Sequence, residues 1–249
     1  KDEHGDTMSK SKGNVVPPSS VIEPYGADTM RLAILFVAPP EKDFDWDEKA
    51  VAGANRFIKR AWRVVWELTK TADASATLDP TALDAASAAL NRELHALGLR
   101  CTHEFDEGQF NTAISAIMEL INAASSYLND VAESERSRAL CYRVASDIVA
   151  MLAPIIPHWA EELQHTALHK ETPVYHEPWP IFDEAQAKSN TVEIAVQIKG
   201  KVRARIMVDA DASEDELSHA AQQAVAQQLE GREIRKVIVV PGCLVNIVA

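Results

Sequence analysis

The sequence predicts a mainly α-helical protein, in which an antiparallel helical bundle is followed by a small α+β domain of ββαββ order. Two observations carry this prediction. Apolar residues recur at helical spacing from about residue 45 to residue 168, whereas from residue 192 to residue 208 they alternate with polar residues, as in half-buried strands. Between the two patterns lies the proline-rich turn Pro178-Trp179-Pro180. We therefore expect three segments, at residues 1–40, 41–185 and 191–249.

The first 40 residues predict a loop followed by two short helices. Residues 5–19 are rich in Ser, Lys, Gly and Pro and have no apolar period, which indicates a mobile loop. Ser19 or Ser20 can cap a short helix that Gly26 breaks. A second, apolar helix from Ala27 to Val37 is expected to follow.

Five helices are expected in the middle segment. On the first, apolar residues such as Phe57 and Ala61 recur on one face. Residues 109–112 offer a cap for the third helix, and Pro154 and Pro157 separate the last two. We expect these helices to form an antiparallel bundle. Their expected bounds are residues 45–71, 81–105, 110–128, 134–152 and 158–168.

The C-terminal segment predicts a hairpin, a helix and two further strands. Apolar residues alternate with other residues in the stretches 192–198 and 202–208, which lie on either side of Gly200. A β-hairpin with one apolar face is therefore expected. Ser213 and Glu216 form a capping box that opens a helix, which Gly231 can end. The last two strands are expected at residues 234–240 and 244–248, around Pro241-Gly242.

The composition is that of a globular protein. Of the 249 residues 47% are hydrophobic and 25% are charged, which excludes disordered and collagen-like classes. Three cysteines without a CxxC spacing support neither a disulfide framework nor a zinc knuckle, and they indicate a cytoplasmic protein. The longest nearly apolar run, residues 148–157, is far shorter than the roughly 18 residues of a membrane span. Because the first residues contain neither an initiator Met nor a signal peptide, we expect a piece of a longer protein.

The segment from Thr7 to Asn14 carries the sharpest chemical signal. It reads Thr-Met-Ser-Lys-Ser-Lys-Gly-Asn, so two lysines stand two residues apart among small residues. Their ammonium groups, together with hydroxyl and backbone N–H donors, suit a polyphosphate. This stretch alone leaves a solvated basic loop open as the alternative.

Two rows of cations are candidates for RNA contact. Lys201, Arg203 and Arg205 are spaced to project from one face of a strand, with Lys199 at the turn, and they can meet a sugar-phosphate backbone. The alternative is an edge strand whose charges block aggregation. For the second row, on the first bundle helix, a solvated face is an equally good interpretation. That row consists of Arg56, Lys59, Arg60 and Arg63.

Net charge does not decide whether RNA binds. The chain carries a formal charge of -12, which disfavours phosphate binding. The acidity lies in the middle, however, because residues 61–190 hold nine Lys and Arg against nineteen Asp and Glu, whereas residues 191–249 hold seven against eight. Local arrangement must therefore decide.

The loop and several later stretches resemble a known family. Residues 8–16 resemble the KMSKS loop of class I aminoacyl-tRNA synthetases, and the segment Tyr25-Gly26-Ala27-Asp28-Thr29 with Arg31-Leu32 resembles the stem-contact segment after that loop. Three further stretches are similar to bacterial leucyl-tRNA synthetases in particular. They are residues 38–46 leading to Arg56-Phe57, residues 110–120 and residues 196–206. The similarity runs in order over essentially the whole chain, from the KMSKS loop to the C-terminus.

The resemblance implies roles for the loop residues. In that family the loop closes over ATP, and its second lysine stabilises the charge that builds on the departing pyrophosphate. This places a catalytic role on Lys10, with Ser9 and Lys12 as further ATP-binding residues, in a motif formed by Thr7, Met8, Ser9, Lys10 and Ser11. Thr7 stands where the family has its first lysine, so the first cation is missing or supplied by Lys12.

The resemblance also implies partners. The intact enzyme would bind leucine, tRNA(Leu), and ATP with Mg²⁺ as a substrate complex, without a dedicated protein metal site. The catalytic nucleotide fold with its HIGH sequence, and any editing domain, are not in these residues. We therefore expect the chain to be inactive alone and to be a monomer. The bundle would correspond to the anticodon-binding helical domain, and the C-terminal domain would touch the outer corner of the tRNA.

Three other interpretations stay open at this point. A stand-alone tRNA-binding protein derived from a synthetase would lack catalysis. A helical adaptor for another protein would show no salt-dependent affinity for tRNA. A valyl or isoleucyl synthetase fragment would share the loop but not the hairpin at residues 196–206.

Other constellations are weaker. A zinc site on the last bundle helix is disfavoured against a solvated helix face, because the order of its residues is not HExxH. The tryptophans favour packing over base stacking, and the cysteines have no paired histidine that would indicate a thiol nucleophile. The residues considered for zinc are His158, Glu161, Glu162, His165 and His169.

Overall fold

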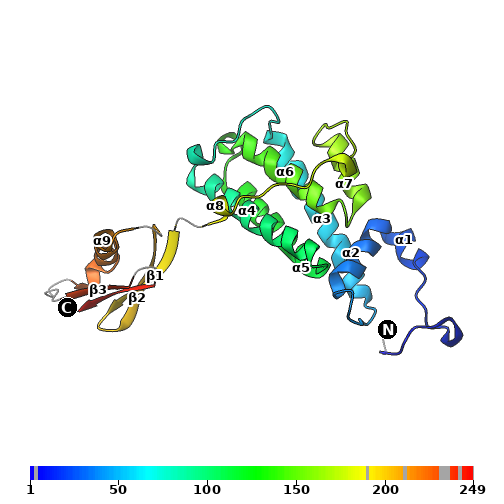
Figure 1. Cartoon of the computed structure of the whole chain (residues 1–249), viewed down its shortest axis with the longest axis horizontal. Coiled ribbons are helices and arrows are strands. Elements are labelled where there is room, and N and C mark those ends of the chain that lie inside the picture. Colours follow the sequence, from blue (N-terminus) through cyan, green and yellow to red (C-terminus); the bar gives the residue numbers. More distant parts are fainter. Residues whose placement is uncertain (3–4, 189–190, 210–211, 230–235, 241–242, 249) are drawn as a thin grey trace. The chain divides into compact units, whose positions relative to one another are not determined.

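The computed structural model describes residues 1–2, 5–188, 191–209, 212–229, 236–240 and 243–248. Over these residues the chain forms two compact units, Lys1–Ala187 and Lys188–Ala249 (Figure 1). The first unit is helical, and the second combines helices with a sheet. The predicted fold class, a helical bundle followed by a small α+β domain, is confirmed. The bounds predicted for the three segments stay predictions.

The first unit opens with a turn and two short helices. These are the 3-10 turn η1 (Lys10–Lys12) and the helices α1 (Ser19–Tyr25) and α2 (Ala27–Val37). Gly26 separates the two helices with a φ of 84°, which a glycine adopts without strain. The prediction that Ser19 or Ser20 caps α1 is wrong. Pro18 occupies the cap position, and the Ser20 hydroxyl donates instead to the carbonyl of Pro17 at 2.7 Å.

Five helices build the bundle, as predicted from the apolar spacing. They are α3 (Glu48–Thr71), α4 (Ala85–Asp106), α5 (Phe110–Asp130), α6 (Arg138–Leu152) and α7 (Pro157–Thr166). Three helices begin later than expected because Asp47, Asp84 and Ser137 cap them with their side-chain oxygens. The expected side-chain cap of α5 is absent, since Gln109 makes no such bond and Thr112 donates its hydroxyl to the Gln109 carbonyl. Short elements in the connections are η2 (Pro80–Ala82), η3 (Glu133–Glu135), η4 (Val174–His176) and α8 (Glu184–Ala187).

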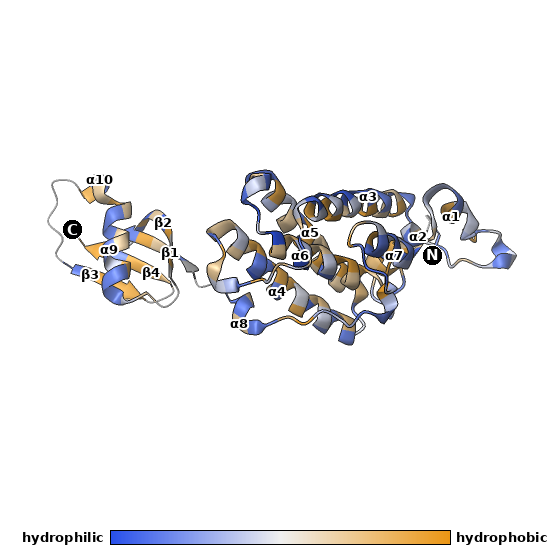
Figure 2. Ribbon diagram, turned by 90° about the horizontal axis from the view of Figure 1, so that it is seen from above, coloured by the Kyte–Doolittle hydropathy of each residue, from blue (hydrophilic) through white to orange (hydrophobic). Residues whose placement is uncertain are grey.

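A single apolar core runs through the bundle. Leu68 of α3, Ile117 of α5 and Ile148 of α6 are fully buried in it, and α4 and α7 close the sides. Figure 2 shows the hydrophobic residues as stripes along these helices. Truncating such a residue to alanine typically costs about 2 to 5 kcal/mol. Among the described residues, no helix is both long enough and apolar enough to cross a membrane.

The segment after α7 runs back across the bundle to α4. The indole N–H of Trp179 donates to the Thr102 hydroxyl at 2.8 Å, and the Phe182 ring lies against Gly98. A Cβ at position 98 would overlap that ring, which explains a glycine in the middle of a helix. This segment therefore ties the end of the bundle to its second helix.

The second unit is a four-stranded sheet, in the described residues, with helix α9 on one face. The strand order is β2-β1-β4-β3, with β1 and β4 parallel and the other pairs antiparallel. Its elements are β1 (Thr191–Ile198), β2 (Lys201–Asp209), α9 (Glu214–Ala224), α10 (Ala226–Leu229), β3 (Lys236–Val240) and β4 (Leu244–Val248). Ile194, Val196 and Val245 face Leu217 of α9 in a separate core.

Some local signals of this unit are confirmed by the structure, and others are not. The Ser213 hydroxyl and the Glu216 carboxylate form the predicted capping box at the start of α9. The helix ends at Ala224 rather than continuing to a glycine, and a short second helix follows. The predictions for Gly231 and for Pro241-Gly242 lie outside the described residues.

Candidate functional site

The lysine-containing loop contains a 3-10 turn with its own side-chain cap. Ser9 caps η1, with its hydroxyl accepting from the Lys12 N–H at 3.3 Å, and Gly13 ends the turn with a φ of 68°. Asn14 closes the base of the loop. Its amide oxygen accepts from the Ser9 N–H at 2.9 Å, and its Nδ2 donates to the Asp2 carboxylate at 2.8 Å.

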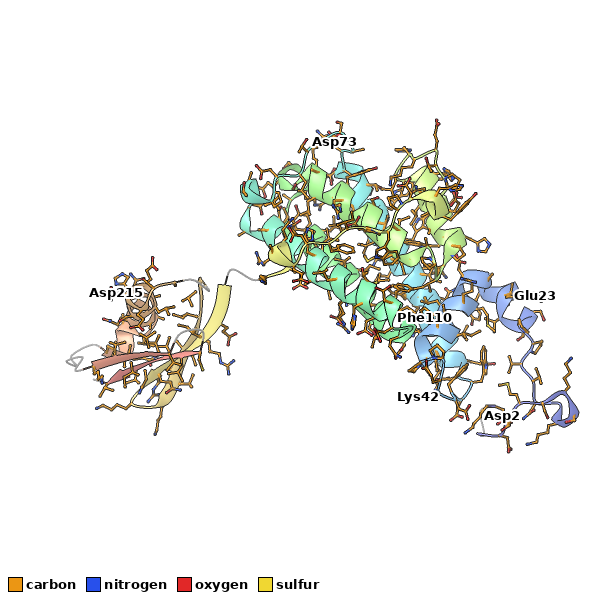
Figure 3. All side chains as sticks on the ribbon, viewed as in Figure 1. Asp2, Glu23, Lys42, Asp73, Phe110 and Asp215 are labelled. Carbon is orange, nitrogen blue, oxygen red and sulfur yellow. The ribbon has the colours of Figure 1, made fainter. Side chains whose placement is uncertain are left out.

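The base of this loop is joined to the start of α3. Asp2, labelled in Figure 3, follows Lys1, whose carbonyl accepts from the Trp46 N–H at 2.9 Å. A cavity of about 570 Å³ lies beside this junction, lined in part by Asn14, Val16 and Trp46. The base of the loop is therefore held by Asp2, and the neighbouring Lys1 is held by Trp46 just before α3.

The two lysines of the loop are presented differently. Lys12 Nζ lies 3.8 Å from the Asp6 carboxylate, whereas Lys10 is exposed and has no carboxylate within 4 Å in the described parts of the chain. The Ser9 N–H and hydroxyl are both used within the loop, and the Ser11 hydroxyl lies 3.2 Å from that of Ser9. Lys10 is thus the group of this loop that is free to meet an anion.

Thr7 and Met8 complete the motif. Thr7 is exposed, and its carbonyl accepts a hydrogen bond from Asn14 Nδ2 at 3.3 Å. Met8 is half-buried. Since the threonine side chain carries no charge, the positive charge of the loop comes from Lys10 and Lys12.

The cation row of α3 lies on one face of the helix. Its members are spaced three, one and three residues apart, and none has a carboxylate within 4 Å among the described residues. The Arg60 guanidinium lies 5.8 Å from the centroid of the Phe57 ring, and its Nε has no hydrogen-bond partner. The other three side chains, Arg56, Lys59 and Arg63, are exposed.

An apolar groove of about 720 Å³ adjoins this row. Arg56 and Arg60 stand at its rim, and Phe36 of α2 and Met118 of α5 are among its walls. The row is therefore next to an apolar surface rather than surrounded by other charges.

A β-bulge changes the arrangement predicted for the hairpin cations. Val196 pairs with Ala204 but Gln197 pairs with Val202, so Arg203 is an extra residue without a partner on β1. Directly opposed residues share a face, so Val202 lies on the face of Gln197 and is 54% exposed rather than packed against the helix.

The prediction that the three strand cations share one face is therefore wrong for Lys201. Lys201 pairs with Ile198, whose side chain is buried under α9, whereas Arg205 pairs with Ala195 on the opposite face. Arg205 also pairs with the Glu193 carboxylate at 2.8 Å. Such an exposed ion pair is worth at most about 1 kcal/mol, so it does not prevent the arginine from meeting another anion.

Lys199 occupies the hairpin turn, as predicted. Lys199 and Gly200 both have positive φ, 50° and 76°, as a two-residue type I′ turn requires. The Gly200 N–H donates to the Asn246 side chain, and the Lys199 N–H donates to the Ile247 carbonyl. These bonds fix the turn against β4.

Two of the histidines predicted as a weak zinc candidate, His158 and His165, are engaged in other contacts. Both ring nitrogens of His165 have partners, the Glu161 carboxylate at 2.8 Å and the Lys170 carbonyl at 2.7 Å. The hydrogen bond to Glu161 raises the pKa of His165. Within the described part of the chain, no group of three or more His, Cys, Asp and Glu side chains is arranged to hold a metal ion.

Three of the tryptophans and two of the cysteines contribute to packing. Trp62 stacks on Trp66 and meets Trp159 edge to face at the bundle end. Burial raises the pKa of the Cys101 thiol to about 12 and also raises that of Cys141, so neither is a thiolate near neutral pH.

The sequence does not reveal several polar groups that organise the site. Asn14 stands out only as part of a motif, and its partners lie within 12 residues in the sequence. Asp28 and Arg31 stand out only as part of a resemblance, yet both make hydrogen bonds to distant segments. Local periodicity carries no signal for a partner more than 100 residues away, so only the motif and the resemblance mark these residues.

Comparison with known proteins gives two matching families. The family described as the anticodon-binding domain of tRNA ligase matches residues 88–218, and the family of class I tRNA synthetases (I, L, M and V) matches residues 1–47. Together they cover the loop, most of the bundle and the start of the second unit.

Among curated proteins, the chain is similar to leucine-tRNA ligases. The ligase of Thermotoga maritima is 40% identical over 247 residues, and that of Alcanivorax borkumensis is 43% identical over 248 residues. Each alignment covers 98% of this chain and 30% of the relative. The chain thus spans about a third of the length of the curated relatives that it matches, and the predicted resemblance is confirmed.

Among solved structures, the fold is similar to a ternary complex of the Agrobacterium radiobacter K84 agnB2 LeuRS with tRNA and LeuAMS. The TM-score is 0.73 and the identity 25%, over 99% of this chain and 31% of that one. A Mycobacterium tuberculosis methionyl-tRNA synthetase shares the fold over 71% of this chain, with a TM-score of 0.52 and 22% identity.

Proposed function

Because the chain belongs to the family of tRNA ligase anticodon-binding domains, we propose that it is the tRNA-binding part of a leucine-tRNA ligase and also supplies the loop that contacts ATP. The observation that carries this proposal is the match to leucine-tRNA ligases over 98% of the chain, in a single alignment. The complete ligase activates leucine with ATP and then transfers it to tRNA(Leu). The chain alone is expected to be a cytoplasmic monomer that does not activate leucine.

The loop has the properties that an ATP-phosphate site requires. Lys10 is exposed and has no carboxylate within 4 Å among the residues that the structure describes. It lies on a turn held by Ser9, Gly13 and Asn14, so its ammonium can approach a triphosphate that arrives with Mg²⁺ as part of the substrate. A positioned cation stabilises the negative charge that develops on pyrophosphate as the leucine carboxylate attacks the α-phosphorus. Lys12, held near Asp6, adds positive potential at the side of the loop.

The tRNA contacts are proposed on both units. The α3 row of Arg56, Lys59, Arg60 and Arg63 has no carboxylate within 4 Å in the described part of the chain. The hairpin offers Lys199, Lys201, Arg203 and Arg205, with Lys201 on a different face of the sheet from Arg205. Cations of this kind bind phosphates and release counterions, so binding weakens as salt rises.

A salt titration of tRNA binding tests this proposal. We expect the chain to bind tRNA(Leu) in a filter-binding assay, with a negative slope of log affinity against log salt. Replacing Arg203 and Arg205 by Ala should weaken binding and flatten that slope by roughly 1.5, at about 0.7 to 0.9 for each lost phosphate contact. The double variant R56A/R63A tests the α3 row in the same way.

The control removes the same amount of charge elsewhere. Arg100 and Arg138 are paired with Glu119 and Asp73, and neither belongs to the two rows. The double variant R100A/R138A should therefore bind as the unchanged chain does. A chain that binds no tRNA, or variants whose slopes equal that of the control, would contradict the proposed tRNA-binding role.

A further inference from the structure

Asp28 on α2 supplies the cap that α7 lacks. The residue before α7, Ile156, offers no side-chain hydrogen bond to the first turn. Asp28 Oδ2 instead accepts from the Trp159 N–H at 2.7 Å, and Asp28 Oδ1 lies 2.8 Å from Nδ1 of His158. The carboxylate is only 13% exposed and faces the positive end of the helix dipole, a favourable place for an anion.

Arg31 on α2 engages the end of α6. Its Nε donates to the Ile155 carbonyl and its Nη2 to the Pro154 carbonyl, both at 2.8 Å. These carbonyls follow the last turn of α6, where backbone acceptors have no partner within the helix and the helix dipole is negative. Asp28 and Arg31 are three residues apart and lie on the same face of α2. Together they bind both ends of the α6–α7 turn, Arg31 at the end of α6 and Asp28 at the start of α7.

We propose that Asp28 and Arg31 form a latch that fixes the loop-bearing corner, residues 9–37, on the bundle and thereby positions Lys10 for leucine activation. The proposal rests on the proposed function of the chain. Figure 1 shows the corner formed by α1 and α2 beside α3, and α2 also contacts α7. The loop ends at Gly13, and α1 begins six residues later, so residues 14–18 and α1 connect the loop to α2.

The latch residues are positioning residues, because they touch the turn between helices and not the substrate. Their effect on catalysis comes from the geometry of the loop. A misplacement of about 1 Å of a catalytic group can cost roughly 10²-fold in rate. Loss of the latch should therefore lower the turnover of leucine activation.

Hydrogen exchange of the chain itself tests the latch without any assumption about activity. We expect D28A and R31A to speed amide exchange in α1 and α2 by at least about 10-fold. The matched control is Y127F, which removes two hydrogen bonds at 2.9 Å inside the bundle, to Ser87 and Ser137. It should leave exchange in α1 and α2 unchanged under conditions where these amides exchange by local opening rather than by global unfolding. Unchanged exchange in both latch variants would overturn the latch.

Kinetics of the complete ligase test the positioning role. We expect D28A and R31A to lower kcat for ATP–pyrophosphate exchange by about 10-fold to 100-fold per active site. The active sites are counted from the burst of adenylate formation. D28N keeps an acceptor for the Trp159 N–H and R31K keeps one donor, so both should recover part of the rate. Y127F should keep the full rate per active site.

The outcomes separate the latch from the proposed function. If the unchanged ligase catalyses leucine-dependent ATP–pyrophosphate exchange and the latch variants catalyse it at the full rate, the positioning role is wrong. The proposed function then still stands. If the unchanged ligase does not activate leucine, the proposed function fails and the positioning role fails with it. In that case the amide hydrogen exchange of α1 and α2 still shows whether Asp28 and Arg31 hold the corner.

Discussion

The buried carboxylate of Asp147 should make the first unit less stable as the pH rises through 6. Asp147 lies on α6 with an 8% exposed side chain, paired with Arg143 at 2.6 Å. Burial raises its pKa from 3.8 to about 6, although Arg143 and Lys170 oppose the rise. The folded state therefore holds this proton more tightly than the unfolded chain does. The resulting stabilisation is complete below pH 3.8 and is lost as the pH rises through about 6.

The magnitude is set by the size of the shift. A difference of about 2 units corresponds to roughly 3 kcal/mol over the whole titration, of which about 1.4 kcal/mol falls between about pH 5 and pH 7.5. The D147N variant has no charge to bury, so it lacks this dependence. We expect the unfolding free energy of D147N, relative to the unchanged chain, to increase by about 1 to 2 kcal/mol from pH 5 to pH 7.5.

Urea unfolding followed by tryptophan fluorescence measures this difference. All five tryptophans lie in the first unit, so the signal reports that unit alone. The control is E119Q, which removes a carboxylate of the exposed pair with Arg100. The difference between E119Q and the unchanged chain should stay constant over this pH range. A difference for D147N that is equally constant would refute a raised pKa at Asp147.

Three further outcomes are expected. Lys10→Ala in the complete ligase should slow pyrophosphate exchange by about 10² while leaving tRNA affinity unchanged, and an unchanged rate would remove Lys10 from the mechanism. Y127F should lower the unfolding free energy by roughly 1 to 3 kcal/mol in urea, because the buried partners of the hydroxyl lose their bonds, and no loss would show that they find other partners. In the native chain a thiol reagent should label Cys243, which is exposed, well before Cys101, whose pKa is raised to about 12, and equal rates would contradict that burial.

Local patterns predict the fold class and most helices, because an amphipathic stripe depends only on neighbours three and four residues away. The start of each helix is harder to predict. Asp47, Asp84 and Ser137 cap helices several residues inside the ranges that apolar spacing indicates. An apolar residue stands just before the first two caps, Trp46 before Asp47 and Leu83 before Asp84, so spacing alone places those boundaries too early.

The candidate site is predictable only in part for the same reason. The motif marks Lys10 and the turn that carries it, but Asp28 and Arg31, which hold the corner, act across more than 100 residues of sequence. The bulge at Arg203 is a further example. Strict alternation assumes that each residue of β2 faces one residue of β1. A single extra residue in β2 moves the side chains of all residues before it on that strand to the opposite face of the sheet. That assumption places both Lys201 and Val202 on the wrong face.

The net charge predicts that the chain repels tRNA, whereas the cations of the α3 row predict that it binds tRNA. The distance of each charge from the bound phosphate determines which effect is larger. At physiological ionic strength the Debye length is about 8 Å, so exposed carboxylates farther away are largely screened. The four cations of the α3 row have no carboxylate within 4 Å among the described residues, whereas Arg100 and Arg138 are each paired with one. For a phosphate that approaches α3, the attraction by the cations of the row therefore exceeds the screened repulsion that the net charge of -12 produces. Equal salt slopes for R56A/R63A and R100A/R138A would show that this local argument is wrong.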